Sequence, residues 1–135
     1  MFSPLIRPAA LALLAVTPVT LLTACTQKGS SNGDGASGAI EVRATDDACE
    51  LSRTSAPAGS IAFEVANEGS KITEFYLYSP GKKVVSEVEG IGPATSRTMT
   101  VKVTEPGAYT TACKPGMVGD GIRGEFTVAV AKAKQ

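Results

Sequence analysis

The residues best suited to chemistry in this chain of 135 amino acids are its three cysteines, Cys25, Cys49 and Cys113. A cysteine thiolate binds soft metal ions or forms a disulfide, and its sulfur can also carry a lipid. The sequence contains no histidine, which excludes Ser-His-Asp and Cys-His nucleophile pairs, HExxH zinc sites and His₂Cys copper centres. Any metal ion in this protein must therefore be held by sulfur and carboxylate ligands.

The overall charge of the chain argues against further classes of function. The 13 Lys and Arg residues balance 13 Asp and Glu residues, so no broad basic face is available for a phosphate backbone, and we expect no nucleic-acid partner. Without histidine, proton transfer would fall to a carboxylate, lysine, tyrosine or cysteine, and the sequence carries no catalytic motif built from these. We therefore do not expect an enzyme.

Residues 1–24 have the features of a bacterial lipoprotein signal peptide. Arg7 is their one charged residue. The apolar stretch 9–22 is interrupted by threonine and proline and is too short for a membrane span of about 20 apolar residues, so it fits a secretory segment. Leu22-Thr-Ala-Cys25 resembles the lipobox, in which the chain is cut before the cysteine and a diacylglycerol is attached to its sulfur. The alternative is an ordinary signal peptide cleaved at nearly the same place.

Lipidation predicts where the mature protein resides. Two acyl chains on Cys25 hold a protein stably on a lipid bilayer. We therefore expect an extracytoplasmic protein anchored to the cell membrane, on a periplasmic or outer face. The stretch 25–38 combines the lipid-bearing cysteine with a Gly/Ser-rich tether about 20 Å in root-mean-square length. Residues 39–130 follow as one domain, and residues 131–135 form a polar tail.

The domain carries the alternating apolar and polar residues of half-buried β-strands. The alternation is clearest in four segments, residues 40–44, 61–66, 98–103 and 126–130. Glycine- and proline-containing turns separate these and other short apolar segments, and no stretch of ten or more residues has a helical pattern. The sequence thus predicts an all-β Greek-key sandwich or barrel of seven or eight strands. The absence of tryptophan disfavours the immunoglobulin version, which packs a core tryptophan on its disulfide.

Cys49 and Cys113 remain as a pair once Cys25 carries a lipid. In an oxidising extracytoplasmic space, an even pair of cysteines usually forms a disulfide. The alternative is a metal site built on the two thiolates. Each cysteine stands singly, without a CxxC motif, so the spacing does not choose between these two outcomes.

Two stretches near the pair resemble cupredoxins. The stretch 107–117, Gly-Ala-Tyr-Thr-Thr-Ala-Cys-Lys-Pro-Gly-Met, is similar to the last ligand strand and loop of that family. The stretch 61–75 is similar to the segment that carries the first ligand histidine, whose place is taken here by Glu74. Gly116 stands where the second ligand histidine would be. The resemblance implies a cupredoxin-like sandwich that lacks the blue-copper ligand set.

A more specific resemblance is to the cupredoxin-like domain of EfeO-type extracytoplasmic iron-uptake proteins. It is carried by residues 46–50, 67–74 and 107–113. The family domain has an early cysteine, a glutamate at the first histidine position and a cysteine at the usual ligand position. The resemblance implies a site for a copper or iron ion whose ligands are Cys49, Glu74 and Cys113. Three further residues are candidates for additional ligands: Asp47, Glu50 and Met117.

This resemblance implies metal uptake, or electron transfer linked to iron transport, with an iron-transport or redox protein as partner. Soft thiolate ligands favour copper or zinc over calcium. The alternative is a different class of function. It is a lipid-anchored β-sandwich that acts as an interaction module, with a structural Cys49–Cys113 disulfide and no metal.

Overall fold

The structure is a computed structural model that describes residues 38–133. Within this range the chain forms nine strands and one short 3₁₀ helix. They are β1 (Ile40–Ala44), β2 (Cys49–Leu51), β3 (Ser55–Pro57), β4 (Gly59–Asn67), β5 (Thr73–Tyr78), β6 (Val84–Ile91), β7 (Ser96–Val103), β8 (Gly107–Cys113), η1 (Pro115–Met117) and β9 (Ile122–Ala129). The predicted signal peptide, the lipidation site at Cys25 and nearly all of the tether lie outside the described residues. No helix within residues 38–133 is both long and apolar enough to cross a membrane.

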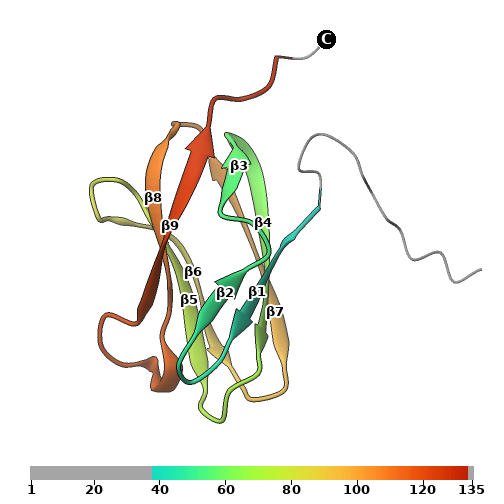
Figure 1. The fold of residues 1–135 in the computed structure, drawn as a ribbon, viewed down its shortest axis with the longest axis vertical. Coiled ribbons are helices and arrows are strands. Elements are labelled where there is room, and N and C mark those ends of the chain that lie inside the picture. Colours follow the sequence, from blue (N-terminus) through green and yellow to red (C-terminus); the bar gives the residue numbers. More distant parts are fainter. Residues whose placement is uncertain (1–37, 134–135) are drawn as a thin grey trace, which may run out of the picture. The chain divides into compact units, whose positions relative to one another are not determined.

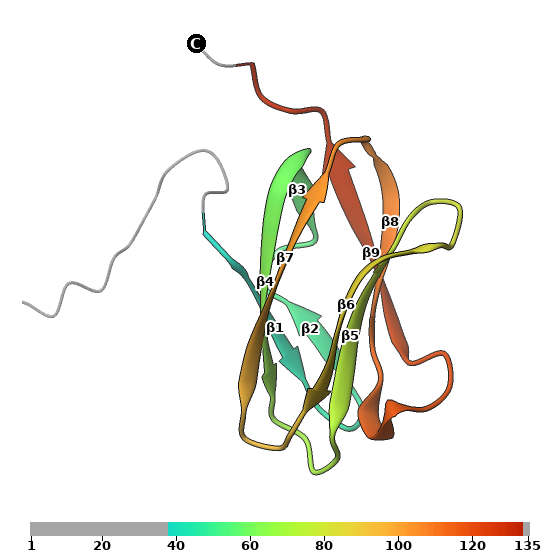
Figure 2. The ribbon, with the colours of Figure 1, turned by 180° about the vertical axis from the view of Figure 1, so that it is seen from behind.

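The strands form two sheets that face each other, as Figures 1 and 2 show from opposite sides. The four-stranded sheet has the order β2-β1-β4-β7, and the five-stranded sheet has the order β3-β9-β8-β5-β6. β1 pairs in parallel with β4, and β3 pairs in parallel with β9. The other neighbouring strands are antiparallel. The expected all-β sandwich is therefore confirmed.

The number of strands differs from the predicted seven or eight because two of the nine are very short. β2 and β3 contain three residues each. Three residues carry too little alternation to be distinguished from a loop in a sequence. Both lie at the edges of their sheets. β2 nevertheless matters for the site, because it begins at Cys49.

The core lies between the two sheets and is centred on three phenylalanines. Phe63 of the four-stranded sheet has its ring centroid 5.2 Å from that of Phe75 and 5.4 Å from that of Phe126, both in the five-stranded sheet. These distances are typical of favourable aromatic pairs. In β1, the predicted alternation is reproduced, with buried and exposed residues in strict turn. The strands are therefore held in register by their apolar faces.

Candidate functional site

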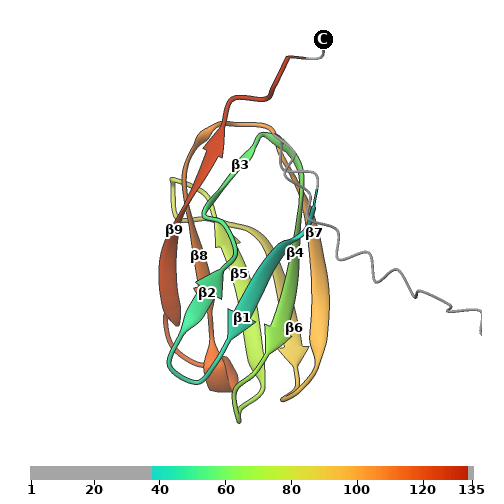
Figure 3. The ribbon, with the colours of Figure 1, turned by 45° about the vertical axis from the view of Figure 1, so that its right-hand side comes forward.

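The site region lies at the end of the sandwich where β8 runs into η1. Figure 3 shows that the turn between β1 and β2 is at the same end of the molecule. β5 and β8 are antiparallel neighbours, and their register places Phe75 opposite Cys113 and Tyr76 opposite Ala112. Because successive side chains of a strand point to opposite faces, this register decides which site residues share a face.

On the core face, Cys113 is joined to Cys49 by a disulfide. The bond links β2 in one sheet to β8 in the other, across a Cα–Cα distance of 5.6 Å and a sequence separation of 64. Cys113 is fully buried in the hydrophobic core, and Cys49 is partly buried against it. The structure thus brings Cys49 and Cys113 together. Of the two alternatives left open by the sequence, a disulfide or a thiolate metal site, it has the disulfide.

On the outer face of the same sheet, Glu74 belongs to a different group of residues. Its side chain is buried and accepts a hydrogen bond from the Tyr76 hydroxyl, with an O–O distance of 3.1 Å. The Tyr76 hydroxyl also lies 3.5 Å from a carboxylate oxygen of Glu89. The Tyr76 ring stacks on the ring of Tyr78, with centroids 5.6 Å apart. Lys114 places its ammonium 4.1 Å from the Tyr76 ring centroid, a cation–π contact.

The surroundings of Tyr76 keep its hydroxyl protonated. Burial raises the pKa of Tyr76 well above the usual value, and the hydrogen bond to Glu74 raises it further. The hydroxyl therefore stays protonated and donates its hydrogen bond to Glu74. This contact gives Glu74 a structural partner on the outer face.

The three predicted metal ligands are not assembled in this structure. Glu74 projects from the outer face of the five-stranded sheet, whereas Cys113 projects into the core and is bonded to Cys49. Within residues 38–133, no group of three cysteine or acidic side chains is arranged to hold a metal ion. A disulfide also offers no thiolate ligand. The copper or iron ion implied by the resemblance does not fit the residues as they are arranged here.

The three additional candidate ligands lie on the surface. Asp47 and Glu50 are exposed, and Glu50 lies 3.8 Å from the guanidinium of Arg43 in a solvent-exposed ion pair. Met117 is 41% exposed and has a positive φ of 57° within η1. Within residues 38–133, neither Asp47 nor Glu50 joins the cysteines in a group that could hold a metal ion.

One residue near the pair has a role that the sequence does not reveal. Asp46 accepts hydrogen bonds from the backbone N–H and the hydroxyl of Ser70, at 3.0 and 2.5 Å, and from the backbone N–H of Lys71 at 3.3 Å. The Ser70 hydroxyl holds the pKa of the Asp46 carboxyl below its usual value. A Cβ at Gly69 would lie only 2.5 Å from an Asp46 oxygen, so glycine is needed there. Asp46 thus fixes the loop that leads into β5.

The comparisons with known proteins agree with this fold. A family model described as a cupredoxin-like domain matches residues 12–128. The structure of dithionite-reduced auracyanin from the photosynthetic bacterium Roseiflexus castenholzii is similar, with a TM-score of 0.56 and 20% identity over 70% of this chain and 99% of that chain. Auracyanin B is similar with a TM-score of 0.54 and 20% identity, over 67% of this chain and 88% of that chain.

At these identities the two solved structures establish a shared fold and no more. No curated protein matches the sequence. The family model covers most of the chain, including all nine strands but the last residue of β9. The chain therefore belongs to the cupredoxin-like domain family.

Proposed function

We propose that this protein is a lipid-anchored, extracytoplasmic cupredoxin-like module that acts by binding another protein, with a structural Cys49–Cys113 disulfide in place of a metal centre. One observation carries the replacement of the metal centre by a disulfide. Glu74 and Cys113 lie on opposite faces of the five-stranded sheet, and Cys113 is bonded to Cys49. The fold is that of a cupredoxin, but the predicted ligands have other partners.

The position of the disulfide supports a structural role. It joins the two sheets, and the chain between the cysteines is long. In the chain-entropy model, closing a loop of this length stabilises the fold by about 4 kcal/mol. Cys113 is fully buried, which hinders attack on its sulfur by an external thiol.

The test compares oxidised and reduced protein for metal binding. The mature chain with Cys25→Ser is titrated with Cu(II), Zn(II) and Fe(III) in its oxidised form, after thiol counting by mass spectrometry. We expect no free thiols, no stoichiometric binding and no thiolate-to-Cu(II) charge-transfer band. A free-thiol pair in protein isolated from the cell envelope, or tight binding by the oxidised form, would contradict the proposal.

The anchor has its own test, because Cys25 lies outside the described residues. Cells expressing the full chain are labelled with an alkyne-bearing fatty acid. We expect label on the wild type and none on Cys25→Ser, which should be released from the membrane fraction. Label on neither protein, with both released, would instead indicate an ordinary signal peptide.

A second candidate function is metal binding by the reduced pair, in metal uptake or in electron transfer linked to iron transport. It is favoured by the contact between Cys49 and Cys113 at one end of a cupredoxin fold, since their reduction would yield two adjacent thiols. Two thiolates select copper or another thiophilic ion. Glu74 would join them only by leaving Tyr76 and changing its face of the sheet.

This second candidate predicts a dependence on both cysteines. The reduced chain, still carrying Cys25→Ser, should bind Cu(I) with one-to-one stoichiometry, and the variant Cys49→Ser/Cys113→Ser should not. Glu74→Gln tests whether the carboxylate takes part, because glutamine can still accept the Tyr76 hydrogen bond. Equal binding by the reduced protein and the double variant would remove this candidate.

A further inference from the structure

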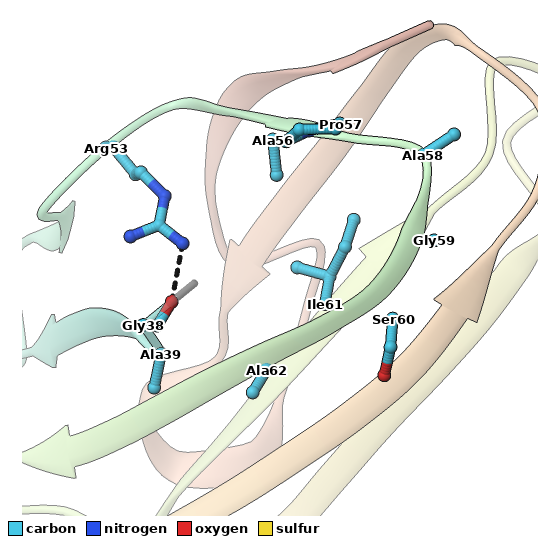
Figure 4. A pocket seen from close by; sticks show the side chains of 10 residues that line it. All are labelled: Gly38, Ala39, Arg53, Ala56, Pro57, Ala58, Gly59, Ser60, Ile61 and Ala62. Atoms are coloured by element: carbon cyan, nitrogen blue, oxygen red, sulfur yellow. Dashed lines mark hydrogen bonds between the residues drawn. The ribbon is translucent and has the colours of Figure 1, made fainter. Parts of the chain in front are cut away.

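A pocket of about 290 Å³ lies at the start of β1, beside the loop from β2 to β3 and the turn from β3 to β4 (Figure 4). This volume is at the lower limit of the roughly 300–1,000 Å³ typical of small-molecule sites. Most of its lining residues are glycine, alanine or another small residue, with Ile61 as the largest apolar side chain. The pocket therefore suits an occupant with small side chains.

Arg53 is the one charged residue among those that line the pocket. Its side chain points towards Gly38 in Figure 4, and one terminal guanidinium nitrogen donates a hydrogen bond to the Gly38 carbonyl at 2.6 Å. Its Nε is enclosed and has no acceptor among the described residues. None of the ion pairs formed within residues 38–133 includes Arg53. A half-buried guanidinium is stabilised by an oxyanion, which it binds with two parallel N–H groups.

The sequence provides one such group close to the pocket. The described part of the chain begins at Gly38, which itself lines the pocket. Asp34, four residues earlier, is the one carboxylate between Cys25 and Gly38. Four residues span at most about 14 Å when extended. The segment 33–37 reads Gly-Asp-Gly-Ala-Ser, whose side chains are as small as the pocket requires.

We propose that residues 33–37 dock in this pocket, with the Asp34 carboxylate paired to the guanidinium of Arg53. The length of chain, the place where it enters the domain and the opposite charges all point to this occupant. The docked segment is the part of the tether nearest the domain. Docking shortens the free tether and fixes the direction in which it leaves the domain.

The pocket and the disulfide lie at opposite ends of the sandwich. Cys113 pairs with Ile122 at the start of β9, and Pro57 pairs with Ala129 at its end. The eight residues from Ile122 to Ala129 are separated by seven steps of about 3.3 Å, so they span about 23 Å of strand. The docking does not depend on the proposed lipid anchor. If Cys25 is lipidated, docking also turns the pocket end towards the bilayer and the disulfide end away from it.

The test follows the motion of the segment by NMR in the mature chain with Cys25→Ser. Backbone order parameters for residues 33–37 should approach those of rigid backbone, near ~0.85, and should fall below ~0.6 in Asp34→Asn. The control Asp47→Asn removes an exposed carboxylate elsewhere and should change neither value. Asp34 precedes the described residues 38–133, and the amide spectrum of Asp34→Asn checks that the domain remains folded. Low order parameters in the unmodified segment would overturn the proposal.

The charge pairing is tested by reversal. Arg53→Asp should release the segment as Asp34→Asn does, and Asp34→Arg combined with Arg53→Asp should restore its order. If the double variant is folded, as judged by its amide spectrum, but residues 33–37 stay disordered, the charge pairing is wrong.

A separate experiment titrates the protein with inorganic phosphate. If it shifts the Arg53 Nε–H resonance to the same extent in the unmodified chain and in Asp34→Asn, the pocket is an open anion site and the segment does not occupy it.

Discussion

The two faces of the five-stranded sheet use neighbouring residues for different purposes. On the core face, Phe75 packs on Phe63 and lies opposite the disulfide-bonded Cys113. Glu74 and Tyr76 stand on either side of Phe75 in the sequence. Their side chains lie on the outer face and belong to a polar and aromatic cluster. A motif that is contiguous in sequence is therefore divided between two environments by the period of the strand. Adjacency in sequence within a strand argues against a shared site.

The largest effect should come from the core face. Phe75→Ala removes a fully buried ring from the central phenylalanine cluster. We expect the free energy of unfolding to fall by about 3–5 kcal/mol, because both transfer energy and packing are lost. Chemical denaturation with the disulfide intact measures this. If Phe75→Ala lowers the free energy of unfolding by less than the outer-face variants do, the core face is not the more sensitive of the two.

The disulfide should rank next. Cys49→Ser/Cys113→Ser frees the chain between the cysteines, and we expect a loss of about 2–5 kcal/mol in the free energy of unfolding. Reduction of the unmodified protein is the matched control and should give a loss of similar size. If the double variant unfolds at the same denaturant concentration as the oxidised protein, the bond does not stabilise the fold.

The outer face should be less sensitive. Tyr76→Phe keeps the ring stacked on Tyr78 and the cation–π contact of Lys114, but leaves the buried Glu74 carboxylate without this donor. An unsatisfied buried acceptor costs about 1–3 kcal/mol. Lys114→Ala removes only the cation–π contact and should cost less than about 1 kcal/mol. Thermal unfolding of both variants measures this order, and a larger loss for Lys114→Ala would show that the hydroxyl contributes little.

The smallest effect concerns the loop that precedes β5 and depends on pH. The pKa of Asp46 is lowered by its hydrogen bonds from Ser70 and Lys71. A carboxylate whose pKa is lower in the folded protein adds stability above its unfolded pKa of about 3.9, and this stability is lost as the pH falls through the folded pKa. Asp46→Asn should therefore be slightly less stable than the unmodified protein at pH 7, and the difference should shrink as the pH falls below about 3.9. Asp47→Asn, for which no loop contact depends on the carboxylate, should show no such difference.

The sequence predicts the fold well because alternation is a local property. The segments 40–44, 61–66, 98–103 and 126–130 show it, and each corresponds closely to a strand. Glycine- and proline-containing turns such as that before Gly107 are equally local, and β8 begins at this residue. Local spacing is sufficient for such statements.

The site was less accessible to sequence reasoning because it depends on register between distant strands. Glu74 and Cys113 are separated along the chain, and only the pairing of Phe75 with Cys113 shows that they face opposite ways. The pocket beside Arg53 depends in the same way on where β3 lies relative to β1. Nothing in the residues around Arg53 marks it as a site before the strands are in place.

The disulfide also has a mechanical consequence. If the protein is held by the proposed N-terminal tether, a pulling force on that tether is transmitted into β1. This strand is paired in parallel with β4 through five residue pairs, from Ile40–Phe63 to Ala44–Asn67. When the tether pulls along β1 and the rest of the domain holds β4 in place, the force acts parallel to the two strands. The hydrogen bonds between β1 and β4 then share the force. If the strands do separate, the bond between Cys49 and Cys113 prevents the chain between them from extending. Only the segments outside that loop can lengthen, so the oxidised domain has a short maximum extension under tension.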